Sequence, residues 1–134
     1  MFIHMHKPDV DGNFGTLLNR WGKRIKWRGR EFVIPRYFET DFASVPRFFW
    51  RVLFHPVHPK AVRAAIAHDY IYRVQPAGWS REQADEMFYD LLLEDGMPKI
   101  TTWLAYKGVR LFGGYSWNES YARNQEGKEN AQRE

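Results

Sequence analysis

The chain has 134 residues, of which 44% are apolar and 17% aromatic, so it can form the core of one folded domain and is not disordered as a whole. It contains no cysteine, which excludes disulfides, thiolate metal sites and a cysteine nucleophile. The net charge of +4 is uneven, because residues 1–51 hold ten Lys/Arg against five Asp/Glu and residues 52–134 hold ten against eleven. The basic part favours an anionic partner (nucleic acid, phospholipid or an acidic protein surface), with solubility as an equally good explanation.

The sequence shows no sign of membrane insertion or secretion. No apolar run approaches the roughly 20 residues that span a bilayer. The segment from Met1 to Asp9 is mostly polar and lacks the apolar centre of a signal peptide. We therefore expect a soluble protein that stays in the cytoplasm or is assembled into a particle there.

The N-terminal third has the pattern of β-strands. Ile25 and Trp27 alternate with cationic neighbours, which is the period of a half-exposed strand. Gly29 supplies a turn, and a second apolar run at 32–34 ends at Pro35. We predict a β-hairpin over about residues 23–34 and irregular structure from Tyr37 to Val52.

Three helices are expected after residue 58. The first begins at about Pro59 or Lys60 and ends at Arg73, and the second follows Ser80, which forms a capping box with Gln83. The third covers roughly 100–112 and is predicted to end at Gly113-Gly114. The fold class is therefore α+β, with an N-terminal β-hairpin or small antiparallel sheet followed by about three helices and a central antiparallel helix hairpin.

The expected domain organisation is simple. Residues 1–118 are predicted to form a single globular domain. The charged segment 119–134 has no large apolar residue after Tyr121, and we predict that it is a flexible C-terminal tail.

The helix hairpin contains the residues that are best suited to chemistry. His68 and Tyr72 are four residues apart and share a face of the first helix, whereas Asp85 lies at the edge of the core-facing arc of the second helix. A carboxylate in that place needs a partner, and His68, Tyr72 and Arg73 are the nearest candidates. A carboxylate that binds one imidazole nitrogen fixes the tautomer and leaves the other nitrogen as a base. The same network can simply join two helices, and we favour this structural explanation over a catalytic or metal-binding role.

Three motifs in fixed order carry a resemblance to a known family. They are Tyr37-Phe38-Glu39-Thr40-Asp41-Phe42-Ala43-Ser44-Val45-Pro46-Arg47, then Ala64-Ala65-Ile66-Ala67-His68-Asp69-Tyr70-Ile71-Tyr72, then Ala84-Asp85-x-x-Phe88. Together they resemble the domain-of-unknown-function family 1353 of tailed phages and prophages, over roughly residues 23–115. The resemblance implies a virion or host-cytoplasm location and other phage structural proteins as partners, without implying an activity.

A second resemblance is local. His-Asp-x-x-Tyr on one helix, followed by Asp on an antiparallel helix, is similar to the catalytic helices of phospholipase A2, particularly the form in parvovirus capsid proteins. This resemblance implies that His68 is the base, that Asp85 orients it, that Tyr72 binds Asp85 and that Asp69 is a calcium ligand, with a phospholipid membrane as substrate surface.

The calcium loop of that superfamily has no counterpart here. The family places a glycine-rich loop before the first helix, but residues 36–60 contain no glycine. Asp41, with its neighbours Thr40 and Ser44, could replace the loop oxygens as a metal ligand. The same residues are also typical of turns and helix caps, which is the explanation that we favour.

Two further patterns are weaker. The histidine pairs His4/His6 and His55/His58 could bind zinc, although surface histidines are the better explanation. Basic residues alternate with tryptophans around the predicted hairpin, as in proteins that bind single-stranded nucleic acid. The same pattern keeps a hairpin soluble, and nucleic-acid binding is possible but not preferred.

Three hypotheses follow for the function. The favoured one is a virion-associated or morphogenesis accessory protein of a tailed phage that keeps a phospholipase-like cluster. The second is an active hydrolase of phospholipid esters, with His68 as base and with or without a requirement for calcium. The third is a phage protein that contacts nucleic acid through its basic hairpin.

Overall fold

A computed structural model describes residues 3–5, 17–19, 23–35, 39–40 and 60–133, with side-chain environments for 24–35 and 60–132. The chain divides into two compact units, Met1–Phe42 and Ala43–Glu134, and each unit is described separately below. The expected irregular segment from Tyr37 to Val52 lies largely outside the described residues. The single domain predicted over 1–118 stays a prediction.

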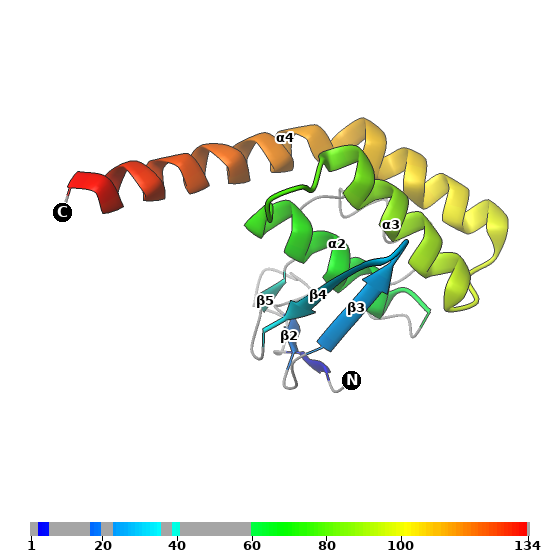
Figure 1. The fold of residues 1–134 in the computed structure, drawn as a ribbon. Coiled ribbons are helices and arrows are strands. Elements are labelled where there is room, and N and C mark those ends of the chain that lie inside the picture. The colour runs from blue at the N-terminus through cyan, green and yellow to red at the C-terminus, as the bar shows by residue number, and fades with distance from the viewer. Residues whose placement is uncertain (1–2, 6–16, 20–22, 36–38, 41–59, 134) are drawn as a thin grey trace. The chain divides into compact units, whose positions relative to one another are not determined.

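The first unit is built from short antiparallel strands. Strands β1 (Ile3–Met5), β2 (Leu17–Asn19) and β5 (Glu39–Thr40) form one sheet in the order β1-β2-β5 (Figure 1). Strands β3 (Lys23–Trp27) and β4 (Arg30–Ile34) form a separate two-stranded sheet.

The β3–β4 sheet is the hairpin that the alternating pattern predicted. Trp27 pairs with Arg30, so the turn consists of Arg28 and Gly29. Both turn residues have positive φ, 46° and 76°, as a two-residue turn between twisted strands requires. Ile25 and Ile34 are fully buried, which agrees with the inward positions of the period-two pattern.

The described part of the second unit contains first two helices, α2 (Val62–Val74) and α3 (Arg81–Glu94). Helix α2 ends at Gln75, which adopts a left-handed conformation with φ 50°. Helix α3 starts with the predicted capping box: the Ser80 hydroxyl accepts from the Gln83 amide, and the Gln83 side chain accepts from the Ser80 amide. The two helices pack side by side (Figure 1).

Helix α4 is much longer than the sequence predicted. It runs from Lys99 to Arg133, so the prediction that a helix ends at Gly113-Gly114 is wrong. Gly113 is buried against α2, where a side chain would have no room, and its packing therefore outweighs its low helix propensity. Residues from Glu119 to Arg133 are helical as well, and the flexibility expected for 119–134 stays a prediction.

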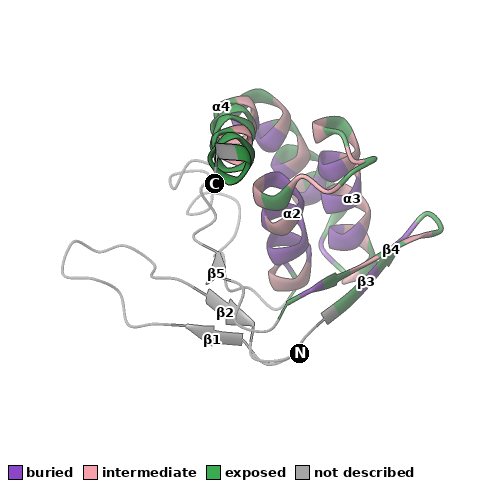
Figure 2. Ribbon diagram, turned by 60° about the vertical axis from the view of Figure 1, so that its left-hand side comes forward, coloured by how far each residue is buried: buried purple, intermediate pink, exposed green. Residues whose placement is uncertain are grey.

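The three helices enclose the core of this unit. The buried faces of α2 and α3 turn toward each other, and the first half of α4 packs against both helices (Figure 2). The small alanines of α2 permit close approach of the neighbouring helices. On α3, the side chains that face the core are almost completely buried, namely Met87, Phe88, Leu91 and Leu92. The strands followed by three helices confirm the α+β class. No described helix combines the length and apolarity that crossing a bilayer requires.

Candidate functional site

Asp85 is the centre of the candidate site, and it has no solvent-exposed surface. Its Oδ1 atom lies 2.7 Å from His68 Nε2 and accepts a hydrogen bond of 2.7 Å from the Tyr72 hydroxyl. His68 and Tyr72 are one turn apart on α2, so both side chains reach the same oxygen. The structure therefore brings together the three residues for which a catalytic role was predicted, while that role itself stays a prediction.

Helix α4 contributes the other half of the cluster. Arg110 Nη1 donates a 2.8 Å hydrogen bond to Asp85 Oδ2. Arg81, at the start of α3, donates from Nε to the Tyr72 hydroxyl over 3.2 Å and from Nη2 to the carbonyl oxygens of Val109 and Arg110. The cluster thus links α2, α3 and α4 through one buried carboxylate.

The protonation of the cluster follows from these contacts. Burial alone would raise the pKa of Asp85, but bonding to His68, with smaller contributions from Tyr72 and Arg110, outweighs it and lowers the pKa below the ordinary value. Burial, followed by the nearby Asp85 charge, raises the pKa of Tyr72 strongly. Asp85 is therefore an anion at neutral pH, and Tyr72 is a neutral hydroxyl that can donate to it.

Aromatic rings surround the imidazole. The His68 ring centroid lies 4.2 Å from that of Tyr72 and 4.9 Å from that of Phe88. Trp117 of α4 meets the Tyr72 ring edge-on at 5.3 Å. Only 2% of His68 is exposed, so these rings hold the imidazole in a fixed, largely dry position.

The predicted metal ligands are not brought together in the part of the chain that the structure describes. Asp69 is buried, and its Oδ2 lies 3.3 Å from Arg73 Nε in the next turn of α2. Arg73 is thus engaged with Asp69, and the idea that it pairs with Asp85 is wrong. Asp41 lies outside the described residues. Within them there is no group of three or more His, Asp or Glu suited to a metal. The calcium site, for which roughly six to eight oxygen ligands would be needed, therefore stays a prediction.

Sequence reasoning missed Arg110 and Arg81. A buried Asp85 needs a positively charged partner, and this requirement could have pointed to a basic residue on the third helix. Arg110 nevertheless had a competitor at Lys107 on the same predicted helix, and spacing within one helix does not show which residue crosses to another. Gly113 could also have indicated close packing of the third helix, because its missing side chain lets α4 approach Tyr72.

The weaker candidates gain no support. Of the histidines considered for zinc, His6, His55 and His58 lie outside the described residues, and His4 is described only as part of β1. In the hairpin, Arg24 pairs with Glu31 at 2.7 Å and the Arg28 guanidinium lies over the Trp27 ring at 4.6 Å. At least these two cations therefore have partners within the hairpin itself.

Fold and site together define a small α+β protein in which a buried carboxylate joins three helices. A family model described as "Protein of unknown function (DUF1353)" matches residues 17–109, which is more than half of the chain. The chain belongs to this family. Comparisons with curated proteins and with solved structures gave no match.

Proposed function

We propose that the chain is a protein of a tailed phage or prophage that acts by contact, as a virion component or an assembly accessory. The chain belongs to the DUF1353 family, and the resemblance of its three motifs to that family implies the phage or prophage origin on which this proposal rests. The partner is another structural protein of the phage. The buried cluster then has a structural task, which is to hold the partner-binding helix in place.

One observation carries the contact role: α4 exposes a line of large apolar side chains. Ile100, Leu104, Leu111 and Tyr115 are spaced by four, seven and four residues, which puts them on one side of the helix. Ile100, Leu111 and Tyr115 are each at least 75% exposed. We call these four residues the α4 apolar stripe. Several large apolar side chains exposed on one side of a helix are typical of a surface that binds another protein.

The cluster supports the same proposal. Both Asp85 oxygens accept hydrogen bonds, and the groups that bind them come from α2 and α4. Arg110 lies on the same helix as the stripe, so its bond to Asp85 fixes the stripe relative to α2 and α3. A buried network whose members are bonded to one another specifies a single arrangement of its helices.

Particle fractionation tests the proposal. The chain, with an affinity tag, is expressed during growth of the phage or induced prophage that encodes it, and particles and assembly intermediates are separated on a gradient. We expect the chain to sediment with one of these fractions. The Leu111→Ser/Tyr115→Ser double variant should remain in the free fraction. The Val33→Ser variant is a matched control, because Val33 is also exposed but lies outside α4, and it should behave like the wild type. A wild-type chain found only as free protein at every stage would overturn the proposal.

A specific observation also favours hydrolysis as a second candidate. His68 binds Asp85 through Nε2, and Tyr72 binds the same carboxylate oxygen, which is the relation implied by the resemblance to phospholipase A2. Nδ1 of His68 would then take the proton of an attacking water and return it to the alcohol that leaves the ester.

Two features place this candidate second. His68 is only 2% exposed, whereas a base must reach water and substrate. Arg110 binds the other oxygen of Asp85, and its charge reduces the ability of that carboxylate to stabilise a protonated imidazole.

Fatty-acid release from mixed phospholipid vesicles, with calcium and then with chelator, separates the two candidates. Hydrolysis that the His68→Ala variant loses, at a melting temperature near that of the wild type, would establish the hydrolase. The contact proposal predicts no release by the wild type under either condition.

A further inference from the structure

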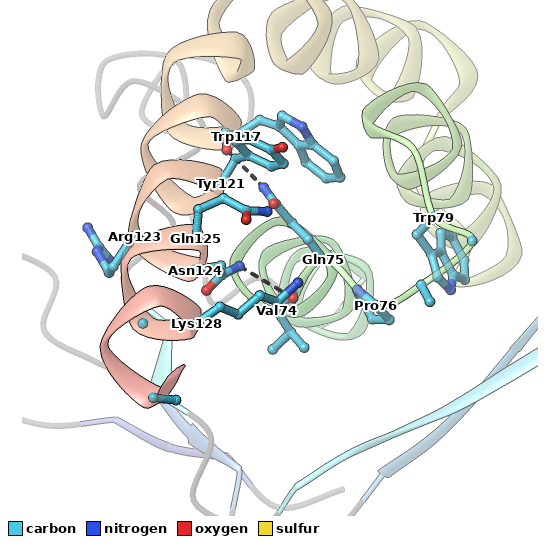
Figure 3. A pocket seen from close by; sticks show the side chains of 14 residues that line it. Val74, Gln75, Pro76, Trp79, Trp117, Tyr121, Arg123, Asn124, Gln125 and Lys128 are labelled. Carbon is cyan, nitrogen blue, oxygen red and sulfur yellow. Dashed lines mark hydrogen bonds between the residues drawn. The ribbon is translucent and has the colours of Figure 1, made fainter. Parts of the chain in front are cut away.

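A groove of about 710 Å³ lies between the α2–α3 connection and the C-terminal half of α4 (Figure 3). It belongs entirely to the unit Ala43–Glu134 and is separate from the Asp85 cluster. Its volume is within the range of small-molecule and cofactor sites. Nothing in the contact role or in the hydrolase candidate uses this groove.

Amide side chains fix the two walls relative to each other. Gln75, in its left-handed conformation at the end of α2, donates from Nε2 to the carbonyl oxygen of Trp117 over 2.8 Å. Asn124 donates from Nδ2 to the carbonyl oxygen of Arg73 over 3.0 Å. Both hydrogen bonds join the α2 end to α4, and Figure 3 shows the Gln75 bond together with a longer one of 3.5 Å from Asn124 Nδ2 to the carbonyl oxygen of Val74. These bonds hold the two walls in one arrangement, which reduces the entropy that binding has to overcome.

Aromatic rings supply the apolar surface of the groove. Trp79 lines it from the α2–α3 connection, and Trp117 and Tyr121 line it from α4. Trp117 is held from behind by the edge of Tyr72, whereas Tyr121 is 55% exposed. One ring is thus anchored and its neighbour is accessible, as in a platform on which a planar ligand stacks.

The charges of the groove are of one sign. Arg123 and Lys128 line it, and no acidic residue does. At about 100° per residue, Glu119 and Glu126 lie on the other side of α4. Arg123 pairs with Glu119 at 3.5 Å, whereas the Lys128 side chain reaches from α4 toward the end of α2 (Figure 3). Lys128 is therefore the cation best placed to meet a negative group inside the groove.

We propose that this groove binds a nucleotide, either free or within a single strand. The base stacks on Tyr121 beside Trp117, and the phosphate pairs with Lys128. Stacking on aromatic rings accepts any base, because every base has a π-face, and the lysine supplies a point charge for the phosphate. This site differs from the basic hairpin, and the proposal does not depend on the contact function of the chain.

Two probes test the proposal on the full chain and distinguish the source of the nucleotide. Thymidine 5′-monophosphate is titrated by calorimetry, and a fluorescein-labelled oligothymidylate is titrated by anisotropy. Saturable binding of the monophosphate supports a free nucleotide as the ligand, and saturable binding of the oligonucleotide alone supports a single strand. Saturable binding of neither probe overturns the proposal.

Variants of α4 then locate the binding site. The Tyr121→Ala variant should bind about tenfold more weakly, which is within the usual effect of removing one stacking ring. The Lys128→Ala variant should also bind more weakly and show a smaller dependence on salt. The Trp103→Ala and Lys107→Ala variants are matched controls, because both residues are exposed on α4 outside the groove, and they should bind like the wild type.

Two outcomes of the variant series would contradict the proposal. One is an equal loss of binding in the control variants, which would indicate a general surface effect. The other is a loss that occurs only when Lys26 or Arg28 of the hairpin is changed to alanine, which would place the nucleic acid on the other unit. Melting temperatures of all variants must stay near the wild-type value, so that a loss of binding is not a loss of fold.

Discussion

Gly113 of α4 lies directly against the hydroxyl of Tyr72 on α2. A Cβ atom at position 113 would be 2.6 Å from Tyr72 Oη and 3.2 Å from two carbons of the ring. The hydroxyl cannot easily move away, since it donates to Asp85 and accepts from Arg81. The glycine therefore allows α4 to come close enough for Arg110 to reach Asp85.

The Gly113→Ala substitution tests this relationship. Alanine favours helix over glycine by about 1 kcal/mol, but the added methyl must displace Tyr72, and such overpacking costs about 1–3 kcal/mol. We expect the net free energy of unfolding to fall, as measured by urea denaturation. Gly127→Ala is the matched control, because a Cβ there would meet nothing within 4 Å, and it should raise the stability by up to about 1 kcal/mol. Stabilisation by both substitutions would show that α4 does not press on Tyr72.

Removal of the central carboxylate should be far more costly than removal of a surface carboxylate. The Asp85→Ala variant leaves His68 and Tyr72 buried without their shared acceptor, and it leaves Arg110 without its counter-charge. We expect a loss of about 3 kcal/mol in the free energy of unfolding. Glu126→Ala, on an exposed part of α4, should change it by less than about 0.5 kcal/mol. Similar small effects for both variants would mean that Asp85 does not hold the helices together.

Acid should weaken the protein through Asp85. The pKa of this carboxyl is lowered in the folded protein from its ordinary 3.8, so in acid the unfolded chain takes up a proton more readily than the folded one. Its contribution to stability is complete above about pH 4 and is lost as the pH falls through the folded pKa. Denaturation between pH 6 and pH 2 should therefore show a steeper loss for the wild type than for Asp85→Asn. Parallel loss in the two proteins would contradict the assignment.

The sequence predicted the hairpin and the start of α3 because those features depend on local chemistry, whereas α2, which no side chain caps, begins at Val62 and not at residue 59 or 60. A two-residue turn with Gly29 between alternating strands and a capping box at Ser80 need no knowledge of the rest of the chain. The contact between His68, Tyr72 and Asp85 was also predictable. His68 and Tyr72 are four residues apart and so share a face of α2, and the short α2–α3 connection brings Asp85 on α3 back alongside that face. The contacts of Asp85 with His68 and Tyr72 confirm that these three residues meet.

The remaining errors concern contacts between distant segments. Gly113-Gly114 was interpreted as a helix end because glycine usually ends helices, but the absence of a side chain serves close packing here. Arg110 could not be assigned to Asp85, since the path of α4 across α2 and α3 depends on that same packing. The groove beside Gln75 and Trp117 was missed for the same reason, because its walls are 42 residues apart in the chain. Asp41 lies outside the described residues, so its role as a metal ligand stays a prediction.

The central claim is that a single carboxylate on α3 ties α4 to the α2–α3 hairpin, and a double-mutant cycle between Asp85 and Arg110 tests it most directly. The free energy of unfolding is measured for the wild type, Asp85→Ala, Arg110→Ala and the double variant. We expect the two substitutions to be coupled by at least about 1 kcal/mol, because residues in direct contact depart from additivity by about 0.5–3 kcal/mol. Effects that add to within about 0.3 kcal/mol would contradict the claim, since they would show that α4 stays in place without this ion pair.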